Sequence, residues 1–323
     1  MIDSFGRKIN YLRLSVTDRC SMRCLYCMPA EGVTKLPRKD ILSYDELFRI
    51  ACAATTLGIE KIRVTGGEPL IRKGISPFLA RLSGIPGLKE LVLTTNGLLL
   101  EEMAGELQSA GVQRLNISLD SLRPELFAHI TRGGDLSRVL SGIQTAERAG
   151  IPIKLNMVVM RGINDAEIAD FVSLAITKPY TVRFIEYMPV IRESNWRSLV
   201  VPGREILARI GRRFSFSPLG LGDLSGPARE FRVAEGAGSF GVITPISGHF
   251  CDGCNRIRVS STGMARGCLF SLTETDLKPY LETHDTVGLQ DALAGIISNK
   301  PGRHQISVTD AEHQPFAMAS VGG

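Results

Sequence analysis

The sequence of 323 residues lacks any apolar run near the ~18 residues that a membrane-spanning helix needs. It also lacks a block of five or more like charges, which excludes a basic arm for nucleic acid. Its 33 glycines and 16 prolines follow no period, which excludes a collagen-like repeat or a low-complexity filament. No apolar stretch of signal-peptide length stands at the start, so we expect a soluble, cytoplasmic protein.

The composition that remains is ordinary for a globular protein, with 44% hydrophobic and 22% charged residues. The net charge of +5 is mild and fits an anionic small molecule as well as nucleic acid. The length suits one large domain or two smaller ones, at ~150 residues each. We expect a first domain over residues 1–200 and a smaller α+β region over 201–323. The second region has strand-like runs at 228–234, 239–244 and 256–260 and a helix near 286–298.

Six of the seven cysteines fall into two triplets with ligand-like spacing, C-x3-C-x2-C (Cys20, Cys24, Cys27) and C-x2-C-x13-C (Cys251, Cys254, Cys268). Packing thiols or disulfides do not account for this clustering. A structural zinc site needs four ligands, but each triplet supplies three, and only His249 lies near one of them. An iron–sulfur cluster on three cysteines leaves one iron open to an outside ligand. Two such clusters indicate catalysis, whereas Cys52, within a predicted helix, is interpreted as a packing residue.

Strands and helices alternate along the first 190 residues. Strand-like runs occur at 10–17, 61–66, 90–96, 114–120, 153–159 and 181–188, with helices near 43–57, 98–110 and 135–149. The first of these helices begins with the capping box Ser43–Glu46 and ends at Gly58. This alternation predicts parallel strands with right-handed crossovers. Six units are too few for a closed eight-strand barrel. We therefore expect a partial (β/α)6 TIM-like barrel, with the C-terminal region across its open side.

The predicted strands also alternate in polarity. Apolar residues occupy one face, whereas Arg13, Arg63, Ser118 and Lys154 lie on the other. Helices cover the outside of such a barrel, so the polar face should point inward, where unpaired cations are unfavourable. A large anionic ligand would resolve this conflict. The alternative is a solvated face, as in an antiparallel sheet with one wet side. The turns at Gly66-Gly67 and Thr94–Gly97 are ambiguous on their own.

Two motifs resemble those of radical S-adenosylmethionine enzymes. They are the first cysteine triplet with Tyr26 before its last cysteine, and Gly66-Gly67-Glu68-Pro69 after the second strand. Further segments are similar to the branch of this superfamily that cyclises GTP in molybdenum cofactor biosynthesis, namely Leu12–Asp18, Cys24–Pro29, Cys251–Arg258 and the terminal Gly322-Gly323. The similarity extends from about residue 5 to the last residue.

This resemblance implies two [4Fe-4S] clusters, one on each cysteine triplet. The first would bind S-adenosylmethionine, with contacts from Tyr26, Gly67, Ser118 and Met188. The second would hold the guanine of GTP, with contacts to GTP from Arg13, Arg63, Thr94, Lys154, Arg256 and Arg258. A 5′-deoxyadenosyl radical would take the ribose 3′ hydrogen, and the product would be (8S)-3′,8-cyclo-7,8-dihydroguanosine 5′-triphosphate. Catalytic roles would fall to Arg13, Arg256, Arg258 and a flexible Gly322-Gly323 tail that reaches into the site.

The same resemblance implies the partners: an electron donor of the flavodoxin type, a downstream cyclic pyranopterin monophosphate synthase and a second copy in a homodimer, with no nucleic acid and no membrane. Two alternatives stay open at this point. One is a peptide-modifying enzyme of the same superfamily, with the second triplet on an auxiliary cluster. The other is a zinc-bearing nucleic-acid-binding protein, which would need a basic stripe and a fourth ligand at each zinc.

Overall fold

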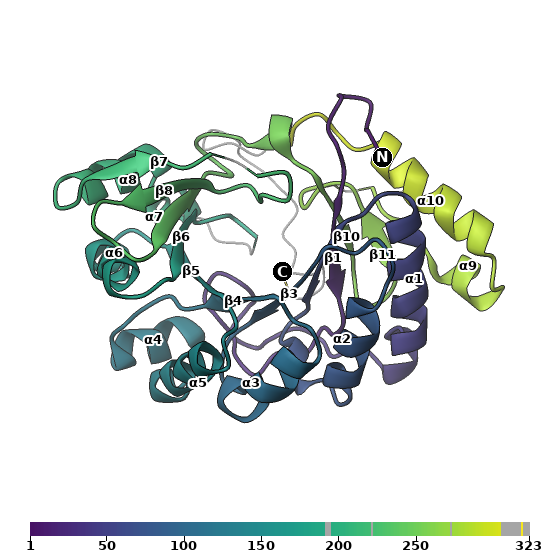
Figure 1. Cartoon of the computed structure of the whole chain (residues 1–323), viewed down its shortest axis with the longest axis horizontal. Coiled ribbons are helices and arrows are strands. Elements are labelled where there is room, and N and C mark those ends of the chain that lie inside the picture. Colours follow the sequence, from purple (N-terminus) through teal and green to yellow (C-terminus); the bar gives the residue numbers. More distant parts are fainter. Residues whose placement is uncertain (191–194, 221, 272, 305–317, 319–323) are drawn as a thin grey trace.

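The computed structural model describes residues 1–190, 195–220, 222–271, 273–304 and 318. Its centre is a twelve-stranded sheet that bends into an arc, in the order β12-β11-β10-β1-β2-β3-β4-β5-β6-β9-β8-β7 (Figure 1). The six strands predicted in the first half are present. They are β1 (Tyr11–Ser15), β2 (Lys61–Thr65), β3 (Glu90–Thr95), β4 (Arg114–Ser118), β5 (Ile153–Val159) and β6 (Thr181–Glu186). They pair in parallel, which confirms the partial barrel.

Strands from beyond residue 200 extend this sheet at both edges. β9 (Ser239–Ile243) pairs in parallel with β6, and β10 (Arg256–Val259) pairs in parallel with β1. Antiparallel strands then end the sheet: β7 (Phe216–Pro218) and β8 (Arg229–Val233) beside β9, and β11 (Met264–Arg266) and β12 (Thr275–Asp276) beside β10. In the described part of the chain the parallel section therefore has eight strands, two more than the sequence predicted.

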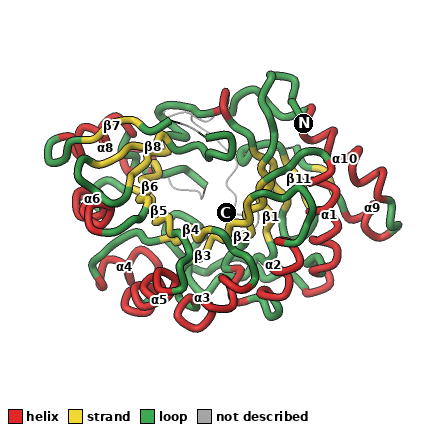
Figure 2. The backbone as a smooth tube through the Cα atoms, viewed as in Figure 1, coloured by secondary structure: helices red, strands yellow, loops and turns green. Residues whose placement is uncertain are grey.

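Helices cover the outer side of the arc (Figure 2). Those of the first half are α1 (Tyr44–Thr56), α2 (Ile75–Ser83), α3 (Leu100–Ser109), α4 (Pro124–Thr131), α5 (Leu136–Arg148) and α6 (Ile168–Thr177). Later helices are α7 (Trp196–Leu199), α8 (Gly203–Gly211), α9 (Lys278–Glu282) and α10 (Thr286–Ser298). The predicted capping box opens α1, since Ser43 Oγ accepts from the Glu46 N–H and the Glu46 carboxylate accepts from the Ser43 N–H.

The main core lies between the outer face of the sheet and these helices. Leu12, Leu14, Ile62 and Val64, the apolar positions of β1 and β2, are fully buried in it. The polar positions between them face the inside of the arc, as the period-two alternation predicts. In the described residues the inner face of the sheet thus borders a lumen and not a packed apolar core. Polar side chains line it from β1, β2 and β4 (Arg13, Arg63 and Ser118), and apolar side chains line it from β5, β6 and β9 (Val158, Ile185 and Ile243).

Candidate active site

The lumen opens at the carboxyl ends of the parallel strands, the usual place for sites in such folds. It is lined by most of the residues that the sequence singled out: all six cysteines of the two triplets, together with Arg13, Tyr26, Arg63, Gly67, Thr94, Ser118, Met188, Arg256 and Arg258. The two triplets are more than 200 residues apart in sequence, yet they line one cavity, because β10 lies beside β1.

A row of arginines crosses the inner face of three neighbouring strands. Arg13 on β1 stands opposite Arg63 on β2 and opposite Arg258 on β10 in the strand register. All three side chains are buried. Within the described residues, the Nε atoms of Arg13 and Arg63 have no hydrogen-bond partner. A buried cation row with open donors fits an anionic ligand.

The electrostatics of this row point the same way. Burial, together with the charges of Arg13 and Arg183 and against the opposing effect of Tyr11, lowers the pKa of Arg63 to about 9. Burial likewise lowers the pKa of Arg258 to about 9, with a further contribution from Arg256. The charged forms are therefore disfavoured by burial and mutual repulsion, which a bound polyanion would relieve.

The first triplet lies in the loop that follows β1. The Cys20 sulfur accepts from the Met22 N–H at 3.4 Å and from Asn96 Nδ2 at 3.8 Å. Burial raises the pKa of the Cys24 thiol well above its usual range, and the nearby charges of Asp120 and the other two cysteines raise it further. Three converging thiols that repel one another as thiolates are suited to a cationic iron–sulfur core.

The second triplet also fits a metal centre. Burial raises the pKa of Cys254, but the charges of Arg256 and Lys300 outweigh it and lower the pKa to about 6. Cys251 is buried and lies within electrostatic reach of Cys254 and Cys268. A thiolate stabilised by neighbouring cations is the form that binds metals.

Arg7 links this triplet to the segment that precedes the C-terminal tail. Its guanidinium is buried, forms an ion pair with Asp3 at 2.6 Å, and donates to the carbonyl of Cys251 at 2.8 Å. It also donates to the carbonyls of Pro301 at 2.8 Å and Gly302 at 3.0 Å. One side chain thus fixes the start of the triplet against residues 300–302.

Tyr26, which is half-buried, and the buried Asp120 form a hydrogen-bonded pair beside the first triplet. The Tyr26 hydroxyl donates to Asp120 Oδ2 at 2.7 Å, and the Val158 N–H donates to Oδ1 at 2.9 Å. Gly67 permits the close approach of the backbone at Arg19, just before the first triplet, since a Cβ at residue 67 would lie 2.2 Å from the Arg19 carbonyl oxygen. Side chains larger than glycine are therefore excluded at residue 67.

Lys154 differs from the other predicted site residues. It lies outside the cavity lining, and its Nζ forms an ion pair with Glu230 Oε1 at 2.8 Å. Arg183, which does line the cavity, shares the same oxygen at 3.0 Å. Burial lowers the pKa of Lys154 to about 8, and Arg183 contributes, against the opposing effect of Glu230. The structure therefore places Lys154 next to the site, in a pair that the sequence did not predict.

The C-terminal tail is described at one position. Met318 lines the lumen, and its N–H donates to the carbonyl of Cys27 at 3.2 Å. The predicted catalytic residues Gly322 and Gly323 lie outside the described residues. The tail therefore contacts the first triplet at Met318.

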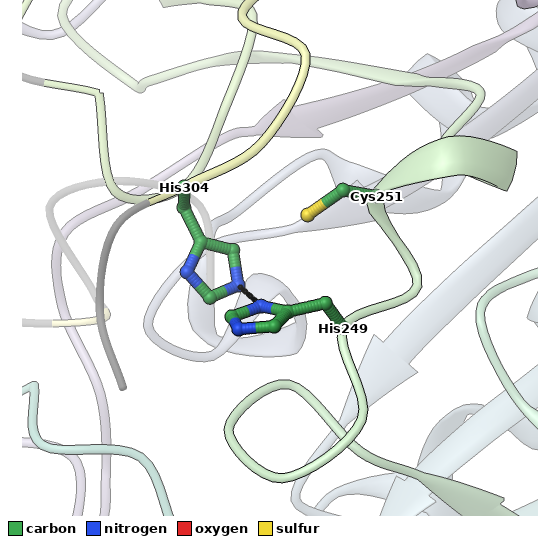
Figure 3. Close-up of side chains that lie close together, drawn as sticks. All are labelled: His249, Cys251 and His304. Atoms are coloured by element: carbon green, nitrogen blue, oxygen red, sulfur yellow. Dashed lines mark hydrogen bonds between the residues drawn. The ribbon is translucent and has the colours of Figure 1, made fainter. Parts of the chain in front are cut away.

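Some lumen residues were not identified from the sequence. Arg183 could have been found, because it alternates with the core residues Val182 and Phe184 on β6. His304, which lines the lumen, and Lys300, which lies outside the lining beside Cys254, carry no such signal, since the tertiary fold alone brings them to the second triplet. In Figure 3, the imidazoles of His304 and His249 lie beside the Cys251 sulfur.

Comparisons with known proteins agree with this geometry. Residues 14–175 match the family model described as the radical SAM superfamily, and residues 180–306 match the model described as Molybdenum Cofactor Synthesis C. A GTP 3′,8-cyclase of Geobacter sulfurreducens is 64% identical over 324 residues, which cover 100% of this chain and 99% of the relative. A GTP 3′,8-cyclase of Peptoclostridium acidaminophilum is 46% identical and covers 100% and 98%.

Among solved structures, Streptococcus suis SuiB bound to S-adenosylmethionine aligns with a TM-score of 0.58 at 15% identity, over 83% of this chain and 61% of SuiB. This likeness supports the fold. The partial barrel and the cysteine loop after β1 thus define a radical S-adenosylmethionine enzyme. More narrowly, the chain belongs to the GTP 3′,8-cyclase family of molybdenum cofactor biosynthesis. No helix in the described residues is long and apolar enough to span a membrane.

Proposed function

We propose that this chain converts GTP to (8S)-3′,8-cyclo-7,8-dihydroguanosine 5′-triphosphate for molybdenum cofactor biosynthesis. The observation that supports this most directly is the single lumen lined by both cysteine triplets and by the arginine row of Arg13, Arg63 and Arg258. One triplet suits the cofactor that starts a radical reaction, and the cations suit a triphosphate.

The residues present fit the two clusters that this function requires. Cys20, Cys24 and Cys27 would hold one [4Fe-4S] cluster, and Cys251, Cys254 and Cys268 the other. Tyr26, Gly67, Ser118 and Met188 would hold S-adenosylmethionine. When bound and given one electron by a donor, the first cluster and S-adenosylmethionine would supply the radical chemistry that removes the ribose 3′ hydrogen of GTP. The chain itself positions the two reactants and excludes water.

The cations would place the substrate. Arg13, Arg63 and Arg258 offer buried donors on one side of the lumen, and Thr94 adds a hydroxyl without a hydrogen-bond partner in the described chain. Arg256, next to the second triplet, donates to the Cys254 sulfur at 3.7 Å and so lies where the guanine end of GTP would bind. Held at both ends, the ribose would lie between the two triplets.

Two further residue sets belong to this proposal. Lys154 now forms an ion pair with the Glu230 carboxylate. It would contact the triphosphate either while keeping this ion pair or after giving it up. Gly322 and Gly323 would enter the lumen and assist Arg256 and Arg258 in catalysis. The contact between the Met318 N–H and the Cys27 carbonyl supports this, because it brings the tail to the edge of the first triplet.

The electron donor would dock beside the first triplet. Six cations are exposed there and define what we term the cysteine-loop face: Arg19, Arg23, Lys35, Arg38, Lys39 and Arg132. Hydrogen bonds join the segments that carry these cations, because the Leu36 N–H donates to Asp18 and Arg132 donates to the carbonyls of Arg23 and Met28. Its charge fits an acidic donor such as a flavodoxin. A cyclic pyranopterin monophosphate synthase would take the product, and the enzyme would work as a homodimer in the cytoplasm.

The test is reconstitution without oxygen, followed by incubation with reductant, S-adenosylmethionine and GTP. We expect about eight irons per chain, four for each cubane, and 5′-deoxyadenosine formed in step with loss of GTP. Cleavage of S-adenosylmethionine with GTP untouched would overturn the substrate assignment and favour a peptide substrate. Zinc without acid-labile sulfide would overturn both clusters.

Two cysteine variants separate the triplets. Cys24→Ala should abolish cleavage of S-adenosylmethionine, because two thiolates do not hold the first cluster. Cys254→Ala should retain uncoupled cleavage and lose cyclisation, because the first triplet is intact. The measurements are 5′-deoxyadenosine and cyclised nucleotide by chromatography. Full cyclisation by Cys254→Ala would make the second triplet structural, and cleavage by Cys24→Ala would remove the first from its assigned role. Cys52→Ala is the matched control, since Cys52 packs beside α10 and should leave both activities unchanged.

A further inference from the structure

Two histidines lie against one member of the second triplet (Figure 3). His249 Nδ1 and His304 Nε2 are 3.2 Å apart, although the residues are 55 positions apart in sequence. One ligand atom from each histidine and the Cys251 sulfur all lie within 4.8 Å of one another. The GTP cyclisation proposed above uses neither imidazole.

Several contacts position the group. Arg7 fixes the Cys251 carbonyl against residues 301 and 302, just before His304. The His304 ring packs against the Phe270 ring, with centroids 4.8 Å apart, and edge-on to the His249 ring at 4.6 Å. Preformed positions of this kind lower the ordering cost of binding a metal ion.

The donor set is that of a divalent transition metal. Two imidazole nitrogens and one thiolate leave a fourth tetrahedral position for water, as in zinc sites with three protein ligands. The two nitrogens now share one imidazole proton. On binding, a metal ion would replace this proton between the two nitrogens. The proton would move to the other nitrogen of the imidazole that carried it, and the Cys251 thiol would release one proton to solvent.

We propose that, before the second cluster is assembled, His249, Cys251 and His304 bind a single divalent transition metal such as Zn²⁺, and that this metal competes with the cluster for Cys251. The competition follows from the shared ligand. When the Cys251 thiolate binds Zn²⁺, only Cys254 and Cys268 of this triplet remain as cluster ligands, and two thiolates are too few for a cubane. The first triplet has no part in this site, so its cluster is unaffected.

The direct test is titration of the full-length, cluster-free chain with Co²⁺ under argon. We expect one equivalent to produce a thiolate-to-cobalt charge-transfer band and the visible bands of tetrahedral Co²⁺. His249→Ala and His304→Ala should each weaken binding about 100-fold, because each removes one of three protein ligands. Cys254→Ser and Cys268→Ser should bind as the parent chain does. His129→Ala, on the exposed face of α4, is the matched control.

Two results would overturn the proposal. One is a cobalt–thiolate band that survives unchanged in both histidine variants. The other is a band that disappears in Cys254→Ser, which would place the metal on the cysteine triplet instead. Far-ultraviolet circular dichroism and a thermal melt establish that each variant is folded, so that loss of binding is not confused with loss of structure.

Competition is measured by iron content. The chain is saturated with Zn²⁺, freed of excess and then reconstituted with iron and sulfide. We expect the parent chain to take up about four irons fewer than an untreated sample, and His304→Ala to take up the same amount with or without Zn²⁺. Equal uptake by the parent chain would refute the competition. This part rests on the second cluster of the proposed function. The presence of that cluster is measured separately, from the iron content of the untreated chain. The cobalt titration does not depend on it, because it uses the cluster-free chain.

Discussion

At the scale of single residues, Asp120 shows how burial changes the chemistry of a carboxyl group in the lumen. Burial raises its pKa to about 6, although the Val158 N–H and the Tyr26 hydroxyl favour the ionised form. The folded-state pKa thus exceeds the ordinary value of 3.8. The stabilisation that follows is fully present below pH about 3.8 and is lost as the pH rises through about 6.

Asp120→Asn tests this directly, because an amide keeps an acceptor for the Val158 N–H and adds a donor toward Tyr26. Between pH 4 and pH 7, the free energy of unfolding of the cluster-free parent chain, measured in urea, should fall by roughly 3 kcal/mol more than that of the variant. This figure follows from a shift of about two pKa units. Parallel stability profiles for the two chains over this interval would contradict the raised pKa.

The buried guanidinium of Arg7 connects Asp3 near the N-terminus to the second triplet. Its removal leaves the buried Asp3 carboxylate and several carbonyls without their partner. Arg7→Ala should therefore lower the free energy of unfolding by about 3–5 kcal/mol. Lys8→Ala should change it by less than about 1 kcal/mol, since Lys8 forms an exposed ion pair with Glu60. Chemical denaturation of both variants gives the comparison, and similar losses would show that Arg7 is not a special contact.

The sequence was sufficient to identify those site residues that follow from the alternation of polar and apolar residues along a strand or from the spacing of a motif. Arg13 and Arg63 alternate with core residues, and both line the lumen with the two cysteine triplets. Period-two alternation cannot show that Lys154 meets Glu230, because that pair joins β5 to β8 across the fold. His304 is likewise invisible in the sequence, since it meets His249 only through tertiary structure.

At the scale of elements, strong local signals predicted position well. The strands of the first half and α1, α3, α5 and α10 agree with the predicted ranges within a few residues. β7, β11 and β12 were not predicted, because each has two or three residues and depends on pairing with a neighbour. Short strands carry too few residues for alternation to be visible.

The capping box of α1 provides the prediction for an element. Ser43→Ala removes the acceptor for the Glu46 N–H and should lower the free energy of unfolding by about 1 kcal/mol. Ser109→Ala is the matched control, because the Ser109 hydroxyl donates to the Gly105 carbonyl within the last turn of α3 and caps nothing. A loss in the control as large as that in Ser43→Ala would show that the cap has no special contribution.

At the scale of the whole molecule, charge distribution makes the proposed electron transfer testable. Lys35→Glu combined with Lys39→Glu reverses part of the cysteine-loop face and should slow turnover with an acidic flavodoxin about 10-fold at low salt. The effect should disappear at high salt, where exposed charges are screened. Turnover with dithionite should not change.

Arg204→Glu combined with Arg212→Glu is the matched control, because both arginines are exposed at α8. The readout is 5′-deoxyadenosine formed with each reductant across a range of ionic strength. An equal slowing by the control pair, or a slowing that persists with dithionite, would remove the cysteine-loop face as the docking site.

The two outer parallel strands, β9 and β10, also have a consequence for biosynthesis on the ribosome. A nascent chain that has emerged only as far as β6 leaves unpaired backbone on two exposed edges, β1 and β6. Such edges are templates for association with other chains. Both close only when residues 239–259 are available. Truncated products should therefore aggregate, and the full-length chain should depend on a holdase chaperone until late in translation.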